Sequence, residues 1–233
     1  MQSLTQSPGQ PFQALLFDFD GTLSRLTIDF PRLRRKITAL AEAFLGEEPE
    51  PSEVPVLEWI TVIADEIALM DEDLGRQFHT RGRLIIQATE LDAARDGELF
   101  PATRPLLLRL RQSGVKVGIL TRNSTAAVKV VFPDVLACCD VFMAREDTQN
   151  VKPHPDHALT LLSRLAVRPE RALLVGDHPL DIEAARRAGI FAAAVQSGHA
   201  SPEALAKAKP DYMAKDCEEL LSFLASRSLL PHA

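Results

Sequence analysis

Cysteines are few in this sequence of 233 residues, and it lacks both long apolar runs and a leader-like start. The three cysteines are an odd number, Cys138 and Cys139 are adjacent, and no zinc-binding spacing is present, so a disulfide-stabilised secreted fold is not expected. The sequence contains no run of about 18 apolar residues, so no transmembrane helix is expected. The start, MQSLTQSPGQP, lacks the charged and apolar regions of a signal peptide. We expect a soluble, cytoplasmic protein that does not bind a membrane.

An excess of positive charge is also missing. Lysine and arginine number 26 against 32 aspartates and glutamates, giving a net charge of -6 and a pI near 5.6. Because nucleic-acid-binding proteins usually neutralise phosphates with a basic surface, no nucleic-acid partner is expected. The basic run PRLRRK at 31–36 is interpreted as the solvated face of a helix, since Leu33, Ile37 and Leu40 recur at helical spacing.

The first hundred residues contain a polar start, a short apolar strand pattern and a long stretch with helical spacing. Residues 1–12 are polar and contain proline and glycine, and are predicted to form a flexible tail before a strand at 14–18. Residues 24–98 show helical spacing without a convincing strand, and this segment is expected to be an all-helical insert. Helices are predicted within it at about 32–45, 56–70 and 74–94.

Beyond residue 100, short apolar runs alternate with amphipathic segments. Strands are predicted at 115–121, 140–144, 172–177 and 191–195, with helices between them. Nearly apolar strands separated by amphipathic helices indicate a parallel sheet covered on both faces. We therefore expect an α/β fold: a doubly wound parallel sheet with a Rossmann-like core formed by 13–23 and 99–233, interrupted after its first strand by the helical segment 24–98.

Polar side chains follow several predicted strands at their carboxyl ends, which is where such a sheet binds ligands. They are Asp18, Asp20, Thr121, Arg122, Asn123, Lys152, Asp177 and Asp181. Carboxylates that converge in one crevice repel each other unless a cation lies among them, and oxygen ligands alone favour Mg²⁺. Because Mg²⁺ commonly shares a substrate phosphate, and a lysine suits phosphate oxygens, the pattern favours a phosphorylated ligand.

Four short stretches carry a family resemblance. DFDGT at 18–22, ILTRN at 119–123, KPHPD at 152–156 and GDHPLD at 176–181 resemble, in order and spacing, the motifs of the haloacid dehalogenase-like hydrolase superfamily. The resemblance spans about 14–195, and the helical segment stands where that family carries its cap. The segment GELFPATRPLLLRLRQSGVKVGILTRN looks most like the phosphoglycolate phosphatase type of subfamily.

The resemblance implies a magnesium-dependent phosphatase that hydrolyses a small phosphorylated metabolite, a phosphomonoester, through an aspartyl-phosphate. Asp18 would be the nucleophile and Asp20 the general acid and base. Thr121, Arg122, Asn123 and Lys152 would bind phosphate. The Mg²⁺ ligands would be Asp18, the backbone carbonyl of Asp20, Asp177 and Asp181, the last directly or through another ligand.

Several alternatives stay open on the sequence alone. Asp181 begins a predicted helix, so it is either near the metal or simply an N-cap. A phosphosugar mutase would keep both aspartates, and a catalytically silent regulatory protein could keep the whole fold. Arg25 either meets an anionic group of the substrate or lies in solvent, and His178 is either a loop residue or a phosphate contact; oligomeric state is open. Candidate substrate-selecting residues in or beside the insert carry no motif: Arg25, Trp59, Arg81 and Arg83.

Overall fold

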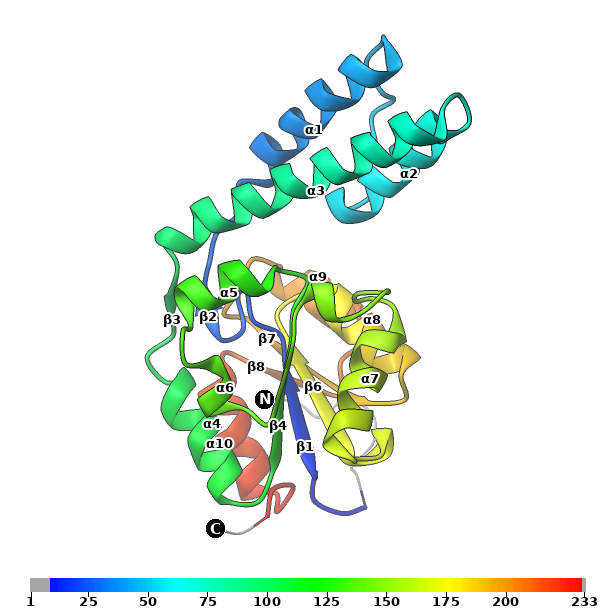
Figure 1. Ribbon diagram of the computed structural model, residues 1–233. Helices are drawn as coiled ribbons and strands as arrows, with labels where there is room; N and C mark the ends of the chain where they lie inside the picture. Colours follow the sequence, from blue (N-terminus) through cyan, green and yellow to red (C-terminus); the bar gives the residue numbers. More distant parts are fainter. Residues whose placement is uncertain (1–8, 232–233) are drawn as a thin grey trace. The chain divides into compact units, whose positions relative to one another are not determined.

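The structure is a computed structural model that describes residues 9–231. It consists of two compact units, each with its own internal packing (Figure 1). Unit 1 is formed by the described parts of Met1–Leu26 and Gly97–Ala233, and unit 2 is Thr27–Asp96. Within residues 9–231, no helix has the length and apolar character needed to cross a membrane.

Unit 1 is built on a six-stranded sheet in which every neighbouring pair of strands is parallel. In spatial order the strands are β5 (Val141–Met143), β4 (Lys116–Leu120), β1 (Ala14–Phe17), β6 (Ala172–Gly176), β7 (Phe191–Val195) and β8 (Tyr212–Ala214). Central strand β1 is completely buried, as expected for an apolar strand covered on both faces. The sheet confirms the expected doubly wound α/β fold.

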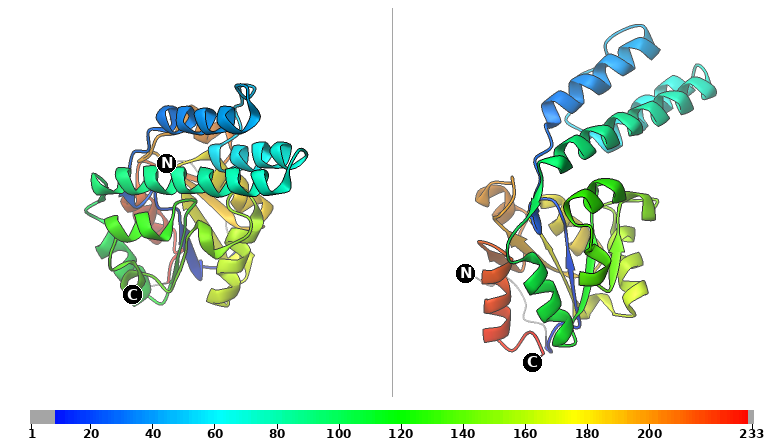
Figure 2. Two further views of the ribbon diagram at one scale, coloured as in Figure 1. Left: turned by 45° about the horizontal axis from the view of Figure 1, so that its top comes forward. Right: turned by 60° about the vertical axis from the view of Figure 1, so that its left-hand side comes forward.

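Helices cover both faces of this sheet. Figure 2 shows α4 and α10 on one face and α7 on the other, and α7 and α8 share one apolar core with the sheet. The helices of unit 1 are α4 (Thr103–Gln112), α5 (Thr125–Val131), α6 (Val135–Cys138), α7 (Pro155–Leu165), α8 (Pro179–Arg187), α9 (Pro202–Lys207) and α10 (Cys217–Ser226). Two 3-10 turns complete the unit: η1 (Arg145–Asp147) and η2 (Pro169–Arg171).

The strand order determines where a ligand site can form. From β1 the chain proceeds to β4 and then outward to β5, whereas β6, β7 and β8 extend from the other side of β1. The order therefore reverses at β1, and ligands of open α/β sheets bind at the carboxyl ends of strands beside such a reversal. The loops after β1, β4, β5 and β6 carry the residues singled out in the sequence.

Unit 2 contains three helices: α1 (Phe30–Leu45), α2 (Val56–Ala68) and α3 (Glu72–Arg95). Helix α1 begins after Asp29, whose side chain accepts a hydrogen bond from the Arg32 backbone N–H, and it ends at Gly46 with a φ of 81°. Apolar side chains at helical spacing pack all three helices around a core that includes Ile37, Ile60 and Phe78.

The structure differs from the sequence expectations in three places. Phe12 was expected in the tail, but it is fully buried and its ring packs against Phe191 and Tyr212; residues 1–8 lie outside the described part. Two strands of two residues each, β2 (Ser24–Arg25) and β3 (Glu98–Leu99), form an antiparallel ribbon where no strand was expected. This ribbon accounts for the difference between the expected insert, 24–98, and unit 2. Strand β8 was not predicted either.

Candidate active site

The turn after β1 places two carboxylates at the end of the strand. The Asp18 backbone N–H donates to the Val175 carbonyl of β6 at 2.9 Å, which holds the start of the turn against the sheet. The turn itself is closed by donors to the Phe19 carbonyl, among them the Leu23 N–H at 2.9 Å. The Thr22 hydroxyl donates to Asp177 Oδ1 at 3.1 Å and thus joins this turn to the loop after β6.

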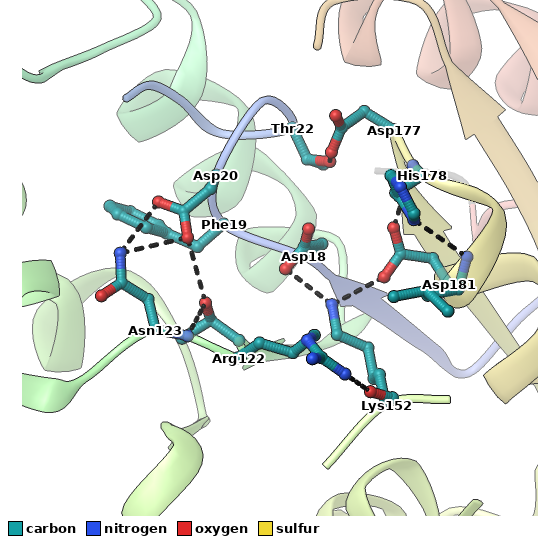
Figure 3. Close-up of polar contacts among 12 residues, drawn as sticks. Asp18, Phe19, Asp20, Thr22, Arg122, Asn123, Lys152, Asp177, His178 and Asp181 are labelled. Atoms are coloured by element: carbon teal, nitrogen blue, oxygen red, sulfur yellow. Dashed lines mark hydrogen bonds and ion pairs between the residues drawn. The ribbon is translucent and has the colours of Figure 1, made fainter. Parts of the chain in front are cut away.

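Lys152 joins two of the carboxylates. Its Nζ lies 2.6 Å from Asp18 Oδ1 and 2.7 Å from Asp181 Oδ1, and only 1% of the Lys152 side chain is exposed. Figure 3 shows the lysine reaching between Asp18, from the β1 end, and Asp181, from helix α8. The loops after β1, β5 and β6 therefore converge as the strand-end argument predicts.

The pKa values of Asp18, Lys152 and Asp177 are shifted because these groups are buried close to other charged groups. Burial raises the pKa of Asp18 to about 6, against the opposing effect of the Lys152 charge. Burial, together with the charges of Asp18 and Asp181, raises the pKa of Asp177 to about 7. Burial acts to lower the pKa of Lys152, but the two carboxylates outweigh it and raise that pKa. One ammonium group is thus insufficient to balance the three carboxylates.

These carboxylates could hold a metal ion. Asp18, Asp177 and Asp181 are all buried, and each offers an oxygen within 4.8 Å of the others. A set of oxygen ligands suits a hard divalent cation. A cation there would favour the ionised carboxylates and so oppose the burial, and the repulsion from neighbouring carboxylates, that raise the pKa values of Asp18 and Asp177. The residues present therefore fit a divalent metal.

A second group of polar side chains surrounds Asp20. The Asn123 amide donates to both Asp20 oxygens, at 3.2 and 3.1 Å, and the Thr121 hydroxyl reaches one of them at 3.5 Å. Figure 3 shows Asp20 pointing toward Asn123 while Asp18 points toward Lys152. The guanidinium of Arg122 donates to the backbone carbonyl of Lys152, which links the loop after β4 to the lysine.

The structure also settles the helix-cap question at Asp181. Its Oδ2 accepts a hydrogen bond from the His178 backbone N–H at 3.1 Å, and the His178 side chain is the N-cap of α8. Asp181 is thus the N3 residue of a capping box, and its other oxygen bonds Lys152. His178 Nδ1 accepts from the Leu180 N–H at 3.2 Å, which gives this histidine a structural contact.

The remaining candidates lie elsewhere. Arg25 is exposed and pairs with Glu98 at 3.0 Å across the β2–β3 ribbon. Trp59 is only 5% exposed and belongs to the core of unit 2. Arg81 lies over the ring of Phe44 within unit 2. Sequence reasoning missed the loop after β7, 196–199, which contacts Asp177 mainly through backbone atoms and carries no functional-group pattern.

The fold and the strand-end cluster define a doubly wound α/β domain with a buried acidic site, and comparisons with known proteins assign it further. A family model described as haloacid dehalogenase-like hydrolase matches residues 12–189. The chain therefore belongs to the haloacid dehalogenase-like hydrolase family, which confirms the resemblance, and it is a phosphoric monoester hydrolase of the phosphoglycolate phosphatase-like kind.

Two curated relatives illustrate this similarity. The phosphoglycolate phosphatase of Salmonella typhimurium (strain LT2) is 30% identical, over 96% of this chain and 95% of the relative. The phosphoglycolate phosphatase of Escherichia coli (strain K12) is 28% identical over the same shares of both chains. The alignment thus spans nearly the whole of each protein, including both units.

Solved structures share the fold. A protein described as a predicted phosphoglycolate phosphatase from Haemophilus somnus has a TM-score of 0.62 and 23% identity, covering 91% of this chain and 97% of that one. CbbY from Rhodobacter sphaeroides, solved in complex with phosphate, has a TM-score of 0.58 and 21% identity, covering 90% and 96%. These similarities support the architecture described above.

Proposed function

We propose that this protein hydrolyses a small phosphomonoester with the help of Mg²⁺, and that the reaction passes through an aspartyl-phosphate on Asp18. The observation that carries the proposal is the arrangement at Asp18, which is buried at the end of β1, bonded to Lys152 at 2.6 Å, and grouped with Asp177 and Asp181. A buried carboxylate held beside a cation has its orientation restricted, as covalent catalysis requires.

The two aspartates of the turn would divide the chemistry between them. An Asp18 oxygen attacks phosphorus, and the bond from phosphorus to the leaving alcohol breaks as Asp20 gives that alcohol its proton. Asp20, now ionised, then takes a proton from the water that attacks the aspartyl-phosphate. Phosphate leaves and Asp18 is restored as a carboxylate. The Asn123 amide at 3.2 and 3.1 Å would orient Asp20 for both steps.

The remaining residues would bind phosphate and metal. Lys152 and the loop Thr121–Asn123 would hold phosphate oxygens and stabilise the charge that develops during transfer. Asp18, the Asp20 carbonyl, Asp177 and Asp181 would hold Mg²⁺, with Asp181 acting directly or by positioning another ligand. When bound, Mg²⁺ would act as a Lewis acid on the transferring phosphoryl group.

Unit 2 would act as a cap that selects the substrate, and the sequence boundaries 24–98 for the cap and 13–23 with 99–233 for the core belong to this proposal. Phosphoglycolate is the first compound to test, because the curated relatives carry the name phosphoglycolate phosphatase. A cytoplasmic location remains a prediction from the sequence.

The test is a screen of phosphorylated metabolites at fixed Mg²⁺ that measures released phosphate and analyses all products. The set should include phosphoglycolate, sugar phosphates, nucleoside monophosphates and an aryl phosphate. Wild type should release phosphate from at least one, and Asp18→Asn, measured beside it, should retain less than about a thousandth of that rate because an amide cannot form the acyl-phosphate. Chelation by EDTA should abolish turnover, and added Mg²⁺ should restore it.

Four results would contradict the proposal. A tenth of the wild-type rate in Asp18→Asn would exclude the covalent step, and undiminished turnover in EDTA would exclude the metal. An isomerised sugar phosphate without net phosphate release would identify a mutase instead. If wild type acts on nothing in the set, with or without Mg²⁺, a regulatory or binding role would be favoured.

A further inference from the structure

The loop after β7 lies directly against Asp177. The hydroxyl of Ser197 donates to the Gly21 carbonyl at 2.7 Å, and the His199 backbone N–H donates to Asp177 Oδ2 at 3.3 Å. The loop 196–199 therefore bonds both to the turn after β1 and to the aspartate after β6. It lies outside all four sequence motifs, so neither the sequence nor the proposed mechanism assigns it a role.

Two glycines form the walls of the space that the Asp177 carboxylate occupies. A Cβ added at Gly198 would overlap the carboxylate, 2.6 Å from Asp177 Cβ. A Cβ added at Gly21 would lie 2.7 Å from Asp177 Cγ and 2.9 Å from the Cα of Gly198. Distances below 3 Å are shorter than van der Waals contact allows, so neither position has room for a side chain. The carboxylate is thus enclosed on two sides by bare backbone.

Hydrogen bonds hold the same carboxylate at both of its oxygens. Thr22 donates to Oδ1 at 3.1 Å and the His199 N–H donates to Oδ2 at 3.3 Å. Since each carboxylate oxygen has two lone pairs, both oxygens keep a position for a further partner. The Ser197 bond to Gly21 links the two walls, so the width of the slot depends on that hydroxyl.

We infer that the loop 196–199 is a positioning element for Asp177, and that Ser197 and Gly198 set the affinity of the site for its divalent cation. This inference rests on the proposed function, in which Asp177 is a metal ligand. Groups that orient a ligating carboxylate typically change metal affinity 10- to 100-fold when they are altered. Ser197 and Gly198 would thus affect the metal without touching the substrate.

The test compares three single variants in the full chain. Gly198→Ala places a methyl group against Asp177, and since Gly198 does not have a positive φ, backbone strain is not the cause of its effect. Ser197→Ala removes only the 2.7 Å bond to Gly21. Ser113→Ala is the matched control, because its hydroxyl likewise donates to a backbone carbonyl, that of Leu110 at 2.8 Å, at the end of helix α4.

The measurement is the rise in melting temperature as MgCl₂ is added without substrate, which gives a half-saturating concentration for each variant. The same concentration is then obtained from turnover of an aryl phosphate. We expect Gly198→Ala to raise the half-saturating MgCl₂ concentration at least about tenfold and Ser197→Ala to raise it about threefold. Ser113→Ala should leave this concentration unchanged. At saturating Mg²⁺, Ser197→Ala should recover most of the wild-type kcat, as expected for a defect in metal binding.

The outcomes separate this inference from the proposed function. If wild type shows no response to Mg²⁺ in either measurement, the proposed metal site itself is wrong and this inference falls with it. If wild type responds and folded Gly198→Ala and Ser197→Ala have the wild-type half-saturating concentration, the inference alone is overturned, even if their metal-free melting temperatures fall. Should Gly198→Ala fail to fold, Ser197→Ala against Ser113→Ala decides the question.

Discussion

Lys152 and Asp18 form a buried ion pair in which the Lys152 ammonium lies 2.6 Å from Asp18 Oδ1. The lysine has a second carboxylate partner, Asp181, at 2.7 Å, so its charge is shared between two acids. Burial raises the pKa of Asp18 to about 6 even though the charge of Lys152 acts to lower it. Lys152 therefore favours the ionised form that a nucleophile needs near neutral pH, and its role can be measured.

Replacement of Lys152 by Met should reduce kcat about 100-fold or more, because a preorganised cation at the phosphoryl group is lost. It should also move the acidic limb of the kcat/KM profile to higher pH. Without the lysine the pKa of Asp18 rises, so a higher pH is needed to ionise it. The profile is measured at saturating Mg²⁺. Lys207→Met, which removes an exposed lysine from helix α9, is the control. If the acidic limb of Lys152→Met stays at its wild-type position, the proposed effect of Lys152 on Asp18 is contradicted.

Replacement of Asp20 by Asn should affect substrates unequally. The loss of kcat should be larger for an alkyl phosphate, whose alcohol must be protonated as it leaves, than for an aryl phosphate with an acidic phenol. Asn123→Ala, which removes the amide that contacts both Asp20 oxygens, should show the same inequality with a smaller loss. Asn150→Ala is the matched control, since that amide donates to Asp156 at 3.0 Å on the surface. Equal losses on both substrates would exclude Asp20 as the general acid.

These two predictions depend on residues that the sequence placed correctly near one another. Asp18, Lys152, Asp177 and Asp181 follow three different strands, and their convergence follows from parallel strands having their carboxyl ends at one edge. What the sequence could not predict was the partner of each group. Asp20 pairs with Asn123, and Thr22 reaches Asp177, 155 residues away, because side-chain directions depend on three-dimensional packing.

The missed parts of the fold have equally physical causes. Strands β2 and β3 have two residues each, which is too short for any alternation of apolar and polar residues. The loop 196–199 acts through a backbone N–H, a small hydroxyl and a glycine, and these groups occur in ordinary turns. Phe12 lies among residues with a loop-like composition, and its burial depends on Phe191 and Tyr212, far along the chain.

Acid should destabilise the fold partly through His157, which is fully buried in helix α7. Burial, with the nearby charge of Lys152, lowers the pKa of His157 to about 3 from an ordinary value of 6.5. Between these pH values the unfolded state binds a proton that the folded state does not. The stability contributed by the neutral histidine is therefore present above pH 6.5 and declines as the pH falls toward 3.

The contribution lost between pH 7.5 and pH 5 should be about 2 kcal/mol. Between pH 7.5 and pH 5 the free energy of unfolding of His157→Gln should therefore fall by about 2 kcal/mol less than that of the wild type. The variant should nevertheless be less stable than the wild type at pH 7.5. Urea unfolding at both pH values measures the difference. His154→Gln serves as the control, because the side chain of His154 is 46% exposed. The same loss in His157→Gln and wild type would show that another group is responsible.

Removal of unit 2 tests the proposed division of labour between the two units. Both connections to unit 2 leave the β2–β3 ribbon, where Arg25 pairs with Glu98 in antiparallel register. Paired residues of antiparallel strands have Cα atoms about 5 Å apart, so a short Gly-Ser bridge can replace Thr27–Asp96 without stretching the ribbon. The shortened chain removes no residue of the sheet, of helices α4–α10 or of the acidic cluster.

The shortened chain should retain magnesium-dependent cleavage of a small aryl phosphate but lose discrimination among metabolites, because the substrate-selecting residues are proposed to lie in unit 2. Discrimination is measured as the ratio of kcat/KM for the best metabolite to kcat/KM for the aryl phosphate. The shortened chain with Asp18→Asn gives the background rate. A folded shortened chain without any hydrolysis would mean that unit 2 also supplies chemistry. An unchanged ratio would instead assign specificity to loops of unit 1, where Arg122 contacts the Lys152 carbonyl and His178 is the N-cap of helix α8.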